Sequence, residues 1–453
     1  MLYTHATIIT VDAARHIIED GAIYVDKDTI ADIGKTDCLL ARYPLERQYS
    51  LNGCIVVPGL VSTHVHTVQA ILRGTADGLH KGTWLSERIQ PLQKSMTNGE
   101  AQASVKLAVA EMLKSGTTCF LECLFFRSHE FDGLCQTVQD SGIRACLGRV
   151  SVEGRPPAGQ IPPGDGMLPE SLKLWHKWNG MANDRIRVWF AAGNPDFVVE
   201  TQMQKLSTAA HSYGIPVTMH LAECKGDAHY FSSIGHTAGS YAQAVGLLSP
   251  STVFAHAVYI NKTSDVPLLS SSGAHISHCP TSNSKLASGI CPVPDLLAAG
   301  LNVSLGTDGN PCNNTSDMFQ EMKWTAMVHN TPGEAARIPA ETVLEMATIN
   351  GAKALGLHHL IGSLEIGKRA DFVALNVQKT ALQPCVNPVS NVVYAATGRD
   401  VHVVVVDGRI VVEGGKLLTM DEEEIIKAAN QAICGLLQRT GLQDKVKSHW
   451  PTR

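Results

Sequence analysis

The chain has 453 residues, of which 44% are hydrophobic and 17% charged, and its formal net charge is −5 at pH 7. This composition excludes an intrinsically disordered protein and leaves enough apolar residues for a large buried core. The acidic net charge and the lack of a basic block argue against nucleic acid or an anionic membrane as a partner.

Targeting and redox signals are weak. The first residues show no basic start followed by an apolar run, and no apolar run approaches membrane-spanning length, so we expect a cytoplasmic protein without a membrane partner. The twelve cysteines follow no repeating frame, and Cys119 with Cys123 is a tight pair without helpful context. We therefore expect reduced or incidental thiols and no disulfide scaffold.

Both ends of the chain carry strand patterns. Alternating or continuous apolar runs bounded by turn residues occur near the start (ATIITVD, GAIYVDKDTIADIG, YSLNGCIVVPG) and near the end (ADFVALNV, VHVVVVDGRIVVEGGKLL). Asp407-Gly408 predicts a tight hairpin turn within the last run. We predict one small β-sandwich domain built from residues 1–57 together with residues 360–420.

The middle of the chain alternates strand-like runs with helical stretches. The eight strand-like runs are IVVPGLVSTHVH, TTCFLE, RACLGR, RVWFAAG, PVTMHLAE, TVFAHA, HISHCP and NVSLGTD. Between the first two, residues 98–116 have apolar residues at helical spacing, a capping box of Thr97 and Glu100, and a terminating Gly116. This pattern predicts an α/β fold with a (β/α)8 TIM barrel over residues 58–359. Residues 421–453 are predicted to form a C-terminal helix and tail.

One segment interrupts this alternation. Residues 153–169, EGRPPAGQIPPGDGMLP, are rich in proline and glycine and follow the third strand-like run. The segment is too long for a simple turn, so it is either a lid or an insertion. We favour a lid, because barrel sites are formed by the loops that follow strands.

Histidines and acidic residues stand at the ends of several strand-like runs. His64 and His66 are two residues apart, so on a strand both side chains face the same side. His220, His256, His278 and Asp308 also end such runs, and these ends meet at one mouth of a barrel. Burying so many imidazoles and carboxylates together would be costly without a cation.

We assign one divalent metal ion to this mouth. The proposed ligands are His64, His66, His220 and Asp308, a set of neutral imidazoles and one carboxylate that suits Zn²⁺, with Fe²⁺ or Mn²⁺ as alternatives. A second metal is not expected, because the fourth strand ends AAGNP and offers no lysine as a bridging ligand.

Three further side chains are assigned roles at the same mouth. Glu223, three residues past His220, is interpreted as a proton shuttle. His256 is either a fifth ligand or a neutral partner for the metal-bound water, and we favour the second role. His278 is either a hydrogen-bond partner behind the ligands or a direct substrate contact.

The motifs THVH, TMHLAE, AHAV, SHCPTSNSKL, GTDGNPCNN and GKRADFVALN resemble the amidohydrolase superfamily. Within it they are most similar to the branch of methylthioadenosine/S-adenosylhomocysteine deaminases and s-triazine hydrolases. The resemblance covers nearly the whole chain. It implies metal ligation by His64, His66, His220 and Asp308, activation of water or substrate by Glu223 and His256, and a homodimer.

The residues expected around a substrate depart from the branch. Deaminases of nucleosides carry a glutamate after a W-L-x5-P segment, where this chain has Gln93, and a histidine before S-P, where it has Gly193. One expected arginine is replaced near Met167. The catalytic motifs match and the substrate residues do not, which argues against a ribosylated adenine as the substrate.

Four residues are candidates for the substrate pocket: Gln69, Trp84, Gln93 and Arg149. Each has an alternative role, as a core residue for Trp84, as loop anchors for the two glutamines, and as a structural ion pair for Arg149. Apolar walls with few polar contacts suit a flat heterocycle.

The favoured function is hydrolytic deamination of an aminated N-heterocycle, purine-like or pterin-like. The cation would lower the pKa of its water to about 7, and the resulting hydroxide would attack the ring carbon that bears the amino group. Asp308 would take the first proton, and Glu223 would protonate the ring nitrogen. Two other hydrolases could use the same centre, one expelling chloride or an amine from a triazine ring and one opening a cyclic amide. A catalytically inactive scaffold is the non-enzymatic alternative.

Overall fold

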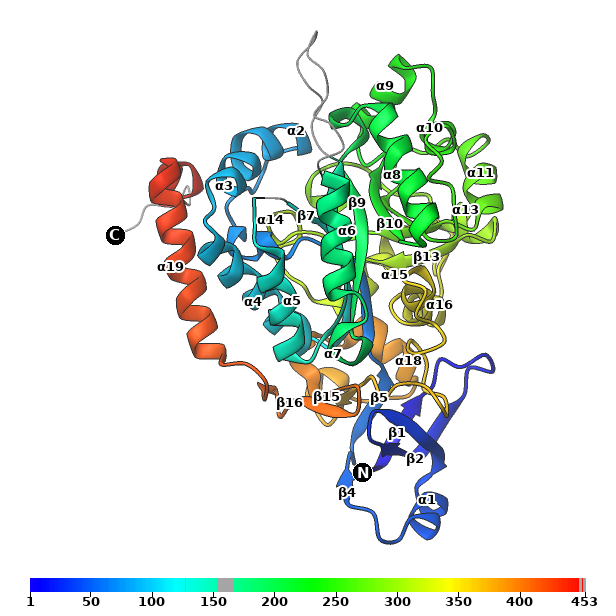
Figure 1. Cartoon of the computed structure of the whole chain (residues 1–453). Helices are drawn as coiled ribbons and strands as arrows, with labels where there is room; N and C mark the ends of the chain where they lie inside the picture. The colour runs from blue at the N-terminus through cyan, green and yellow to red at the C-terminus, as the bar shows by residue number, and fades with distance from the viewer. Residues whose placement is uncertain (127, 153–166, 448–449, 451–453) are drawn as a thin grey trace.

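The computed structural model describes residues 1–126, 128–152, 167–447 and 450. The middle of the chain forms eight parallel strands in one barrel (Figure 1). In chain order the strands are β6 (Leu60–Val65), β7 (Thr117–Phe125), β8 (Arg144–Val152), β9 (Ile186–Ala192), β10 (Val217–Leu221), β11 (Thr252–His256), β12 (His275–His278) and β13 (Asn302–Leu305). The barrel predicted from the alternating pattern is confirmed.

The last strand of the barrel is tied to the first. The hydrogen-bonded order runs from β6 to β13 without a crossover, and a bridge joins Val65 to Asp308. There the backbone N–H of Asp308 donates to the carbonyl of His64 at 2.8 Å, and the Thr63 hydroxyl donates to the carbonyl of Leu305 at 2.9 Å. These bonds fix the two ends of the barrel next to each other at the mouth.

Helices cover the outside of the barrel (Figure 1). They include α4 (Asn98–Lys114), α5 (Phe131–Ser141), α6 (Met167–Trp178), α7 (Met181–Asp184), α8 (Glu200–Tyr213), α9 (Lys225–Ser233), α10 (Ala238–Ala244), α11 (Asp265–Ser272), α13 (Val293–Ala298), α15 (Met318–Val328), α16 (Ala340–Met346) and α17 (Ile349–Ala354). The capping box at the start of α4 is formed as predicted: Thr97 accepts from the backbone of Glu100, and Glu100 accepts from the backbone of Thr97.

Short helical segments lie at the mouth of the barrel. Between β6 and α4 they are η1 (Thr67–Leu72), α2 (Lys81–Trp84), η2 (Leu85–Ile89) and α3 (Gln90–Ser95). After later strands they are η3 (Pro195–Phe197), α12 (Pro280–Lys285) and α14 (Asn310–Asn313). These segments supply much of the wall of the site described below.

The first predicted barrel strand is divided between two sheets. Residues Cys54–Pro58 form β5, which pairs with β14 (Phe372–Asn376) outside the barrel, and only β6 belongs to the barrel. Gly59 makes the crossing possible, because a Cβ atom at this position would lie 1.9 Å from Oγ1 of Thr118 on β7.

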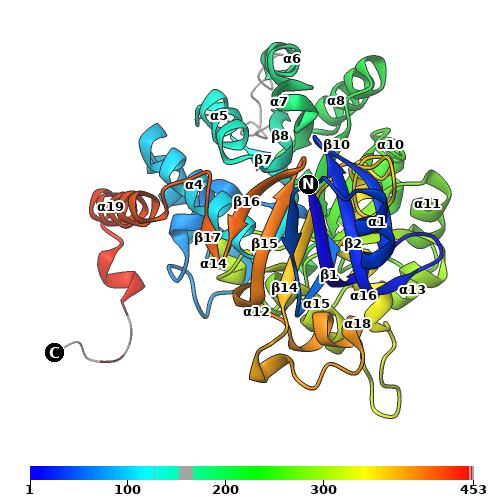
Figure 2. The ribbon, with the colours of Figure 1, turned by 90° about the horizontal axis from the view of Figure 1, so that it is seen from below.

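Both ends of the chain build a separate mixed sheet of nine strands (Figure 2). Its other strands are β1 (Leu2–Ile9), β2 (Ile17–Asp26), β3 (Thr29–Lys35), β4 (Gln48–Ser50), β15 (Val401–Val406), β16 (Arg409–Glu413) and β17 (Lys416–Leu417). The predicted hairpin turn lies between β15 and β16, with positive φ angles of 52° at Asp407 and 75° at Gly408. The predicted β-sandwich is thus one mixed sheet, continuous in its hydrogen bonds, with buried apolar residues on both faces.

Smaller elements flank this sheet. They are α1 (Thr36–Arg42), α18 (Pro388–Ser390), η4 (Thr380–Leu382), η5 (Asn391–Ala395) and η6 (Gly398–Asp400). The chain then continues into α19 (Glu422–Thr440) and η7 (Gln443–Val446). Helix α19 packs along α4 (Figures 1 and 2), and ion pairs join Lys114 to Glu422 and Arg439 to Glu100.

Two predictions about the organisation of the chain stay predictions. They are the domain boundaries after residues 57, 359 and 420, and the lid, since residues 153–166 lie outside the described part and Met167 begins α6. Within the described residues, no helix has both the length and the apolar character needed to cross a bilayer.

Candidate metal centre

Three histidines and an aspartate converge where the barrel strands end. His64 lies on β6 and His66 follows it directly, while His220 lies on β10 and Asp308 follows β13. The exposed fractions of these residues range from 0% to 8%. Four polar side chains are therefore gathered in a place that water barely reaches.

Three of the distances between donor atoms of these side chains match the spacing that one shared cation requires. Nε2 of His66 is 3.3 Å from Nε2 of His220 and 3.4 Å from Oδ1 of Asp308. Nε2 of His64 is 3.6 Å from the same oxygen. Ligands that bind one zinc ion tetrahedrally at about 2.1 Å lie roughly 3.4 Å from one another. These three distances are those expected between ligands of a single divalent cation.

Two local backbone features bring Asp308 to the imidazoles. A Cβ atom on Gly306 would lie 2.6 Å from the Cβ of His64, so only glycine allows β13 to approach β6 this closely. Asp308 itself has a left-handed backbone with φ of 59°. Its Oδ1 accepts from the N–H of Gly309 at 2.7 Å, and its Oδ2 accepts from the Ser282 hydroxyl at 2.5 Å.

Burial sets the protonation of the candidate ligands. It lowers the pKa of His64 to about 4 and holds the pKa of His220 well below its usual value, where the neighbouring imidazoles act in the same direction. Burial opposes ionisation of Asp308, but the hydrogen bond and charge of His64 hold its pKa well below the usual range. Neutral imidazoles and an ionised carboxylate are the forms that bind a metal.

Glu223 and His256 lie beside these four residues. Nε2 of His256 is 3.8 Å from Oε2 of Glu223 and 4.0 Å from Oδ2 of Asp308. Nδ1 of His256 lies 2.9 Å from Oδ1 of Asn283, which accepts the hydrogen bond, so in the neutral tautomer that makes this bond Nε2 is the acceptor nitrogen. That Nε2 is buried and has no hydrogen-bond partner among the described residues.

Lys81 is a functional candidate that the sequence analysis missed. Its Nζ lies 2.8 Å from Oε2 of Glu223 and 3.0 Å from Oδ2 of Asp227. Burial disfavours the ammonium group, yet the two carboxylates raise the pKa of Lys81 above its usual value. No sequence pattern indicated this contact, because Lys81 lies in α2 while its two partners follow β10, far away in the sequence.

Cys123 also lies at the centre, although the sequence analysis placed no thiol there. Its Sγ is 3.4 Å from Nε2 of His66 and 3.7 Å from Nε2 of His64, and its S–H donates to the carbonyl of Val65 at 3.1 Å. Burial raises the pKa of this thiol well above its usual value. The sequence feature that could have identified Cys123 is its position near the end of the second barrel strand. All twelve cysteines are free thiols.

A pocket of about 70 Å³, here called the inner pocket, opens onto the centre. His66, His220, Glu223, His256 and Asp308 line it, and so do Gln69, Lys81, Trp84 and Gln93. Besides Nε2 of His256, three polar atoms of these residues are buried without a hydrogen-bond partner in the described part of the chain: Oε1 of Gln69, Nε1 of Trp84 and Nε2 of Gln93. Buried polar atoms without a partner can form hydrogen bonds with a polar ligand that enters the pocket.

Two predicted substrate residues lie elsewhere. Arg149 donates to the carbonyl of Phe126 at 2.6 Å and pairs with Glu170 at 3.2 Å. Nε2 of His278 lies 3.3 Å from Nε2 of His329. Neither residue is among the described residues that line the inner pocket, and their roles as substrate contacts stay predictions.

A parallel barrel whose carboxyl-terminal mouth gathers imidazoles and carboxylates is typical of metal-dependent hydrolases. Residues 55–411 match the amidohydrolase family. The chain belongs to the amidohydrolase family, as the sequence motifs predicted.

Several relatives and solved structures are similar to this chain over almost its whole length. A 5-methylthioadenosine/S-adenosylhomocysteine deaminase of Teredinibacter turnerae is 37% identical over 430 residues, which cover 94% of both chains. An adenosine deaminase of Xanthomonas campestris, solved with bound zinc, has a TM-score of 0.89 and 29% identity, and the match covers 96% of this chain and 98% of that one. The atrazine chlorohydrolase of Arthrobacter aurescens shares the fold, with a TM-score of 0.88 and 22% identity over 95% of this chain and 99% of that one.

Proposed function

We propose that this amidohydrolase is a metal-dependent deaminase that releases ammonia from a purine-like or pterin-like aminated N-heterocycle. The observation that carries the proposal is the buried cluster of His64, His66, His220 and Asp308 with Glu223 and His256 next to it. The names of the relatives support the same reaction class, since they are deaminases of adenosine derivatives.

The proposed cofactor is one divalent cation held by His64, His66, His220 and Asp308. Zn²⁺ suits three neutral imidazoles and a carboxylate, and a related solved structure holds zinc, while Fe²⁺ and Mn²⁺ remain alternatives. When bound at such a site, a divalent cation supplies activated water as a nucleophile near neutral pH.

The residues of the chain would then handle protons and orientation. Asp308, which accepts hydrogen bonds from Ser282 and Gly309, would accept the proton that the water loses. His256, held through Nδ1 by Asn283, would orient the attacking water with Nε2. Glu223, once protonated, donates to the ring nitrogen next to the reacting carbon. The products are the keto heterocycle and ammonia, and the water supplies the oxygen and both protons.

The three unpartnered polar atoms of Gln69, Trp84 and Gln93 can form hydrogen bonds with the polar edge of a heterocycle. Oε1 of Gln69 can accept a hydrogen bond from a ring N–H, and Nε1 of Trp84 and Nε2 of Gln93 can donate to ring nitrogens or a ring oxygen. The inner pocket holds no glutamate at position 93 to bind a pair of ribose hydroxyls, which favours substrates other than ribosylated adenine.

An assay of released products tests the proposal. Zinc-loaded protein is incubated with aminopurines, aminopterins, an aminated chlorotriazine and a cyclic amide, and ammonia, chloride, amine and new carboxylate are measured. Ammonia from an aminopurine or aminopterin is the expected result. Release of only chloride or amine, or of only a carboxylate, would replace the proposal with one of the other two hydrolases.

For the assembly and location, we propose a homodimer in the cytoplasm. The support is the family resemblance for the dimer and the sequence composition for the location. Light scattering of the purified chain would measure its mass in solution, with a mass of one chain as the contrary result.

A further inference from the structure

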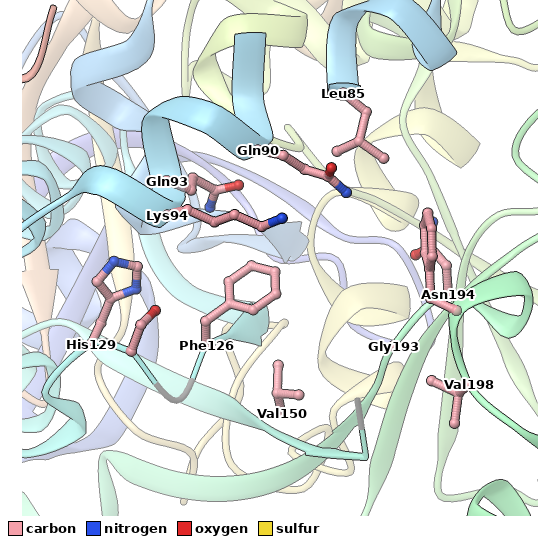
Figure 3. A pocket seen from close by; sticks show the side chains of 12 residues that line it. Leu85, Gln90, Gln93, Lys94, Phe126, His129, Val150, Gly193, Asn194 and Val198 are labelled. Atoms are coloured by element: carbon pink, nitrogen blue, oxygen red, sulfur yellow. The ribbon is translucent and has the colours of Figure 1, made fainter. Parts of the chain in front are cut away.

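A second cavity of about 300 Å³, here called the outer cavity (Figure 3), shares lining residues with the inner pocket. Leu85, Gln93, Phe126 and Asn194 line both spaces. A substrate whose ring occupies the inner pocket can therefore extend a substituent into the outer cavity past these four side chains. The inference below rests on the proposed function, because it concerns that substituent.

The outer cavity has apolar walls and one cation. Its apolar wall includes Leu85, Phe126, Val150 and Val198. The solvent-exposed Lys94 supplies the charge, and no aspartate or glutamate stands among the described residues that line the cavity. Within that same part of the chain, no carboxylate pairs with Lys94. In Figure 3 the Lys94 side chain extends over the cavity above Phe126.

A buried imidazole on the same wall also lacks a partner. His129 is 3% exposed, and neither of its ring nitrogens has a hydrogen-bond partner among the described residues. Figure 3 shows His129 on the same side of the cavity as Lys94, with Asn194 and Val198 on the opposite side. Burial and the charge of Arg149 lower the pKa of His129, so at neutral pH the ring offers one N–H donor and one acceptor. A buried polar group without a partner costs free energy, which points to a ligand atom at this position.

Together these features define the chemistry of a substituent. Apolar walls suit a hydrocarbon stem, and an unpaired ammonium group with a neighbouring N–H donor suits an anionic oxygen group at its end. A terminal ammonium group would meet Lys94 and find no carboxylate on the described walls. We infer that the outer cavity binds a ring substituent with an apolar stem and a terminal carboxylate, which pairs with Lys94 and accepts a hydrogen bond from His129.

Three matched probes test this inference. Each is adenine with a five-carbon chain on an imidazole nitrogen, ending in a methyl group, a carboxylate or an ammonium group. Ammonia release gives kcat and KM for each probe, and calorimetric titration of zinc-loaded Glu223→Gln protein gives affinities without turnover. We expect the carboxylate probe to bind about tenfold more tightly than the methyl probe through a lower KM, and the ammonium probe to bind more weakly than either.

Variants separate the contributions of the two side chains. Lys94→Met should remove the preference for the carboxylate probe and leave the methyl probe unchanged, while Lys94→Arg should keep the preference. His129→Phe should weaken the binding of the carboxylate probe only. The control is Lys106→Met, which changes an exposed lysine of α4 outside both cavities. Circular dichroism checks that each variant is folded.

The outcomes for this inference and for the proposed function are distinguishable. Equal affinity for the methyl and carboxylate probes, or a preference that survives Lys94→Met, would overturn the inference while ammonia release still supports the deaminase. If no probe releases ammonia, the proposed function fails for adenine-type rings, and the titrations still decide whether Lys94 selects the carboxylate.

Discussion

At the level of single residues, Glu223 is the proposed proton donor; it lines the inner pocket, 2.8 Å from Lys81 and 3.8 Å from His256. Glu223→Gln removes the proton and keeps the shape of the side chain. We expect kcat to fall by about 10²–10⁴-fold with zinc content unchanged, since general acid–base catalysis contributes about that much. Ammonia release and elemental analysis measure the two quantities. Glu200→Gln, on the exposed start of α8, is the control. A Glu223→Gln protein with full metal and near wild-type kcat would remove Glu223 from the mechanism.

A second prediction concerns Lys81, whose ammonium group pairs with Glu223 and Asp227. Lys81→Met would leave Glu223 and Asp227 near each other without a counter-ion, and a carboxylate in that situation holds its proton more tightly. The alkaline limb of the pH profile of kcat/KM should therefore move to higher pH. Lys262→Met, which breaks an exposed ion pair with Asp295, should leave the profile unchanged. An unaltered profile in Lys81→Met would mean that the ammonium group has only a structural role.

At the level of elements, the crossing from β5 to β6 depends on Gly59. Gly59→Ala would place a methyl group 1.9 Å from the Thr118 hydroxyl oxygen, and overpacking of this kind costs about 1–3 kcal/mol. Urea unfolding should show this loss of stability. Gly99→Ala in α4 is the control: nothing lies within 4 Å of its added methyl group, and alanine favours a helix by up to about 1 kcal/mol. Equal stabilities for the two variants would contradict the close crossing.

The same elements explain what the sequence could predict. Period-two spacing placed His64 and His66 on one face of a strand, and strand ends in a barrel must meet, so His220 and Asp308 could be added. Lys81 and Cys123 could not be assigned in this way, because each acts through contacts with residues far away in the sequence. The division of the first predicted barrel strand at Gly59 was also missed, because a continuous apolar run does not show that its two halves belong to different sheets.

At the level of the whole molecule, a buried ion cluster links the barrel to the terminal sheet. Arg144 on β8 pairs with Asp371 at 3.0 Å and with Asp407 at 3.1 Å, and all three side chains are buried. Arg144→Met would leave the buried Asp371 without its cation and Asp407 with Arg369 as its remaining cation, at a cost of about 3–5 kcal/mol in the free energy of unfolding. Arg187→Met, which breaks a half-exposed pair with Asp184, should cost less than about 1 kcal/mol in the same urea titration. Similar losses would show that the cluster does not hold the two units together.

The central claim is that His64, His66, His220 and Asp308 bind one catalytic cation, and metal analysis of paired samples tests it most directly. Elemental analysis of the purified chain should give about one divalent ion per molecule, and His220→Asn should lose both the ion and ammonia release. Chelated wild-type protein should lose activity and regain it with zinc. A chain that keeps its full rate of ammonia release after its metal has been stripped, or a His220→Asn variant that still binds one ion with full activity, would contradict the account.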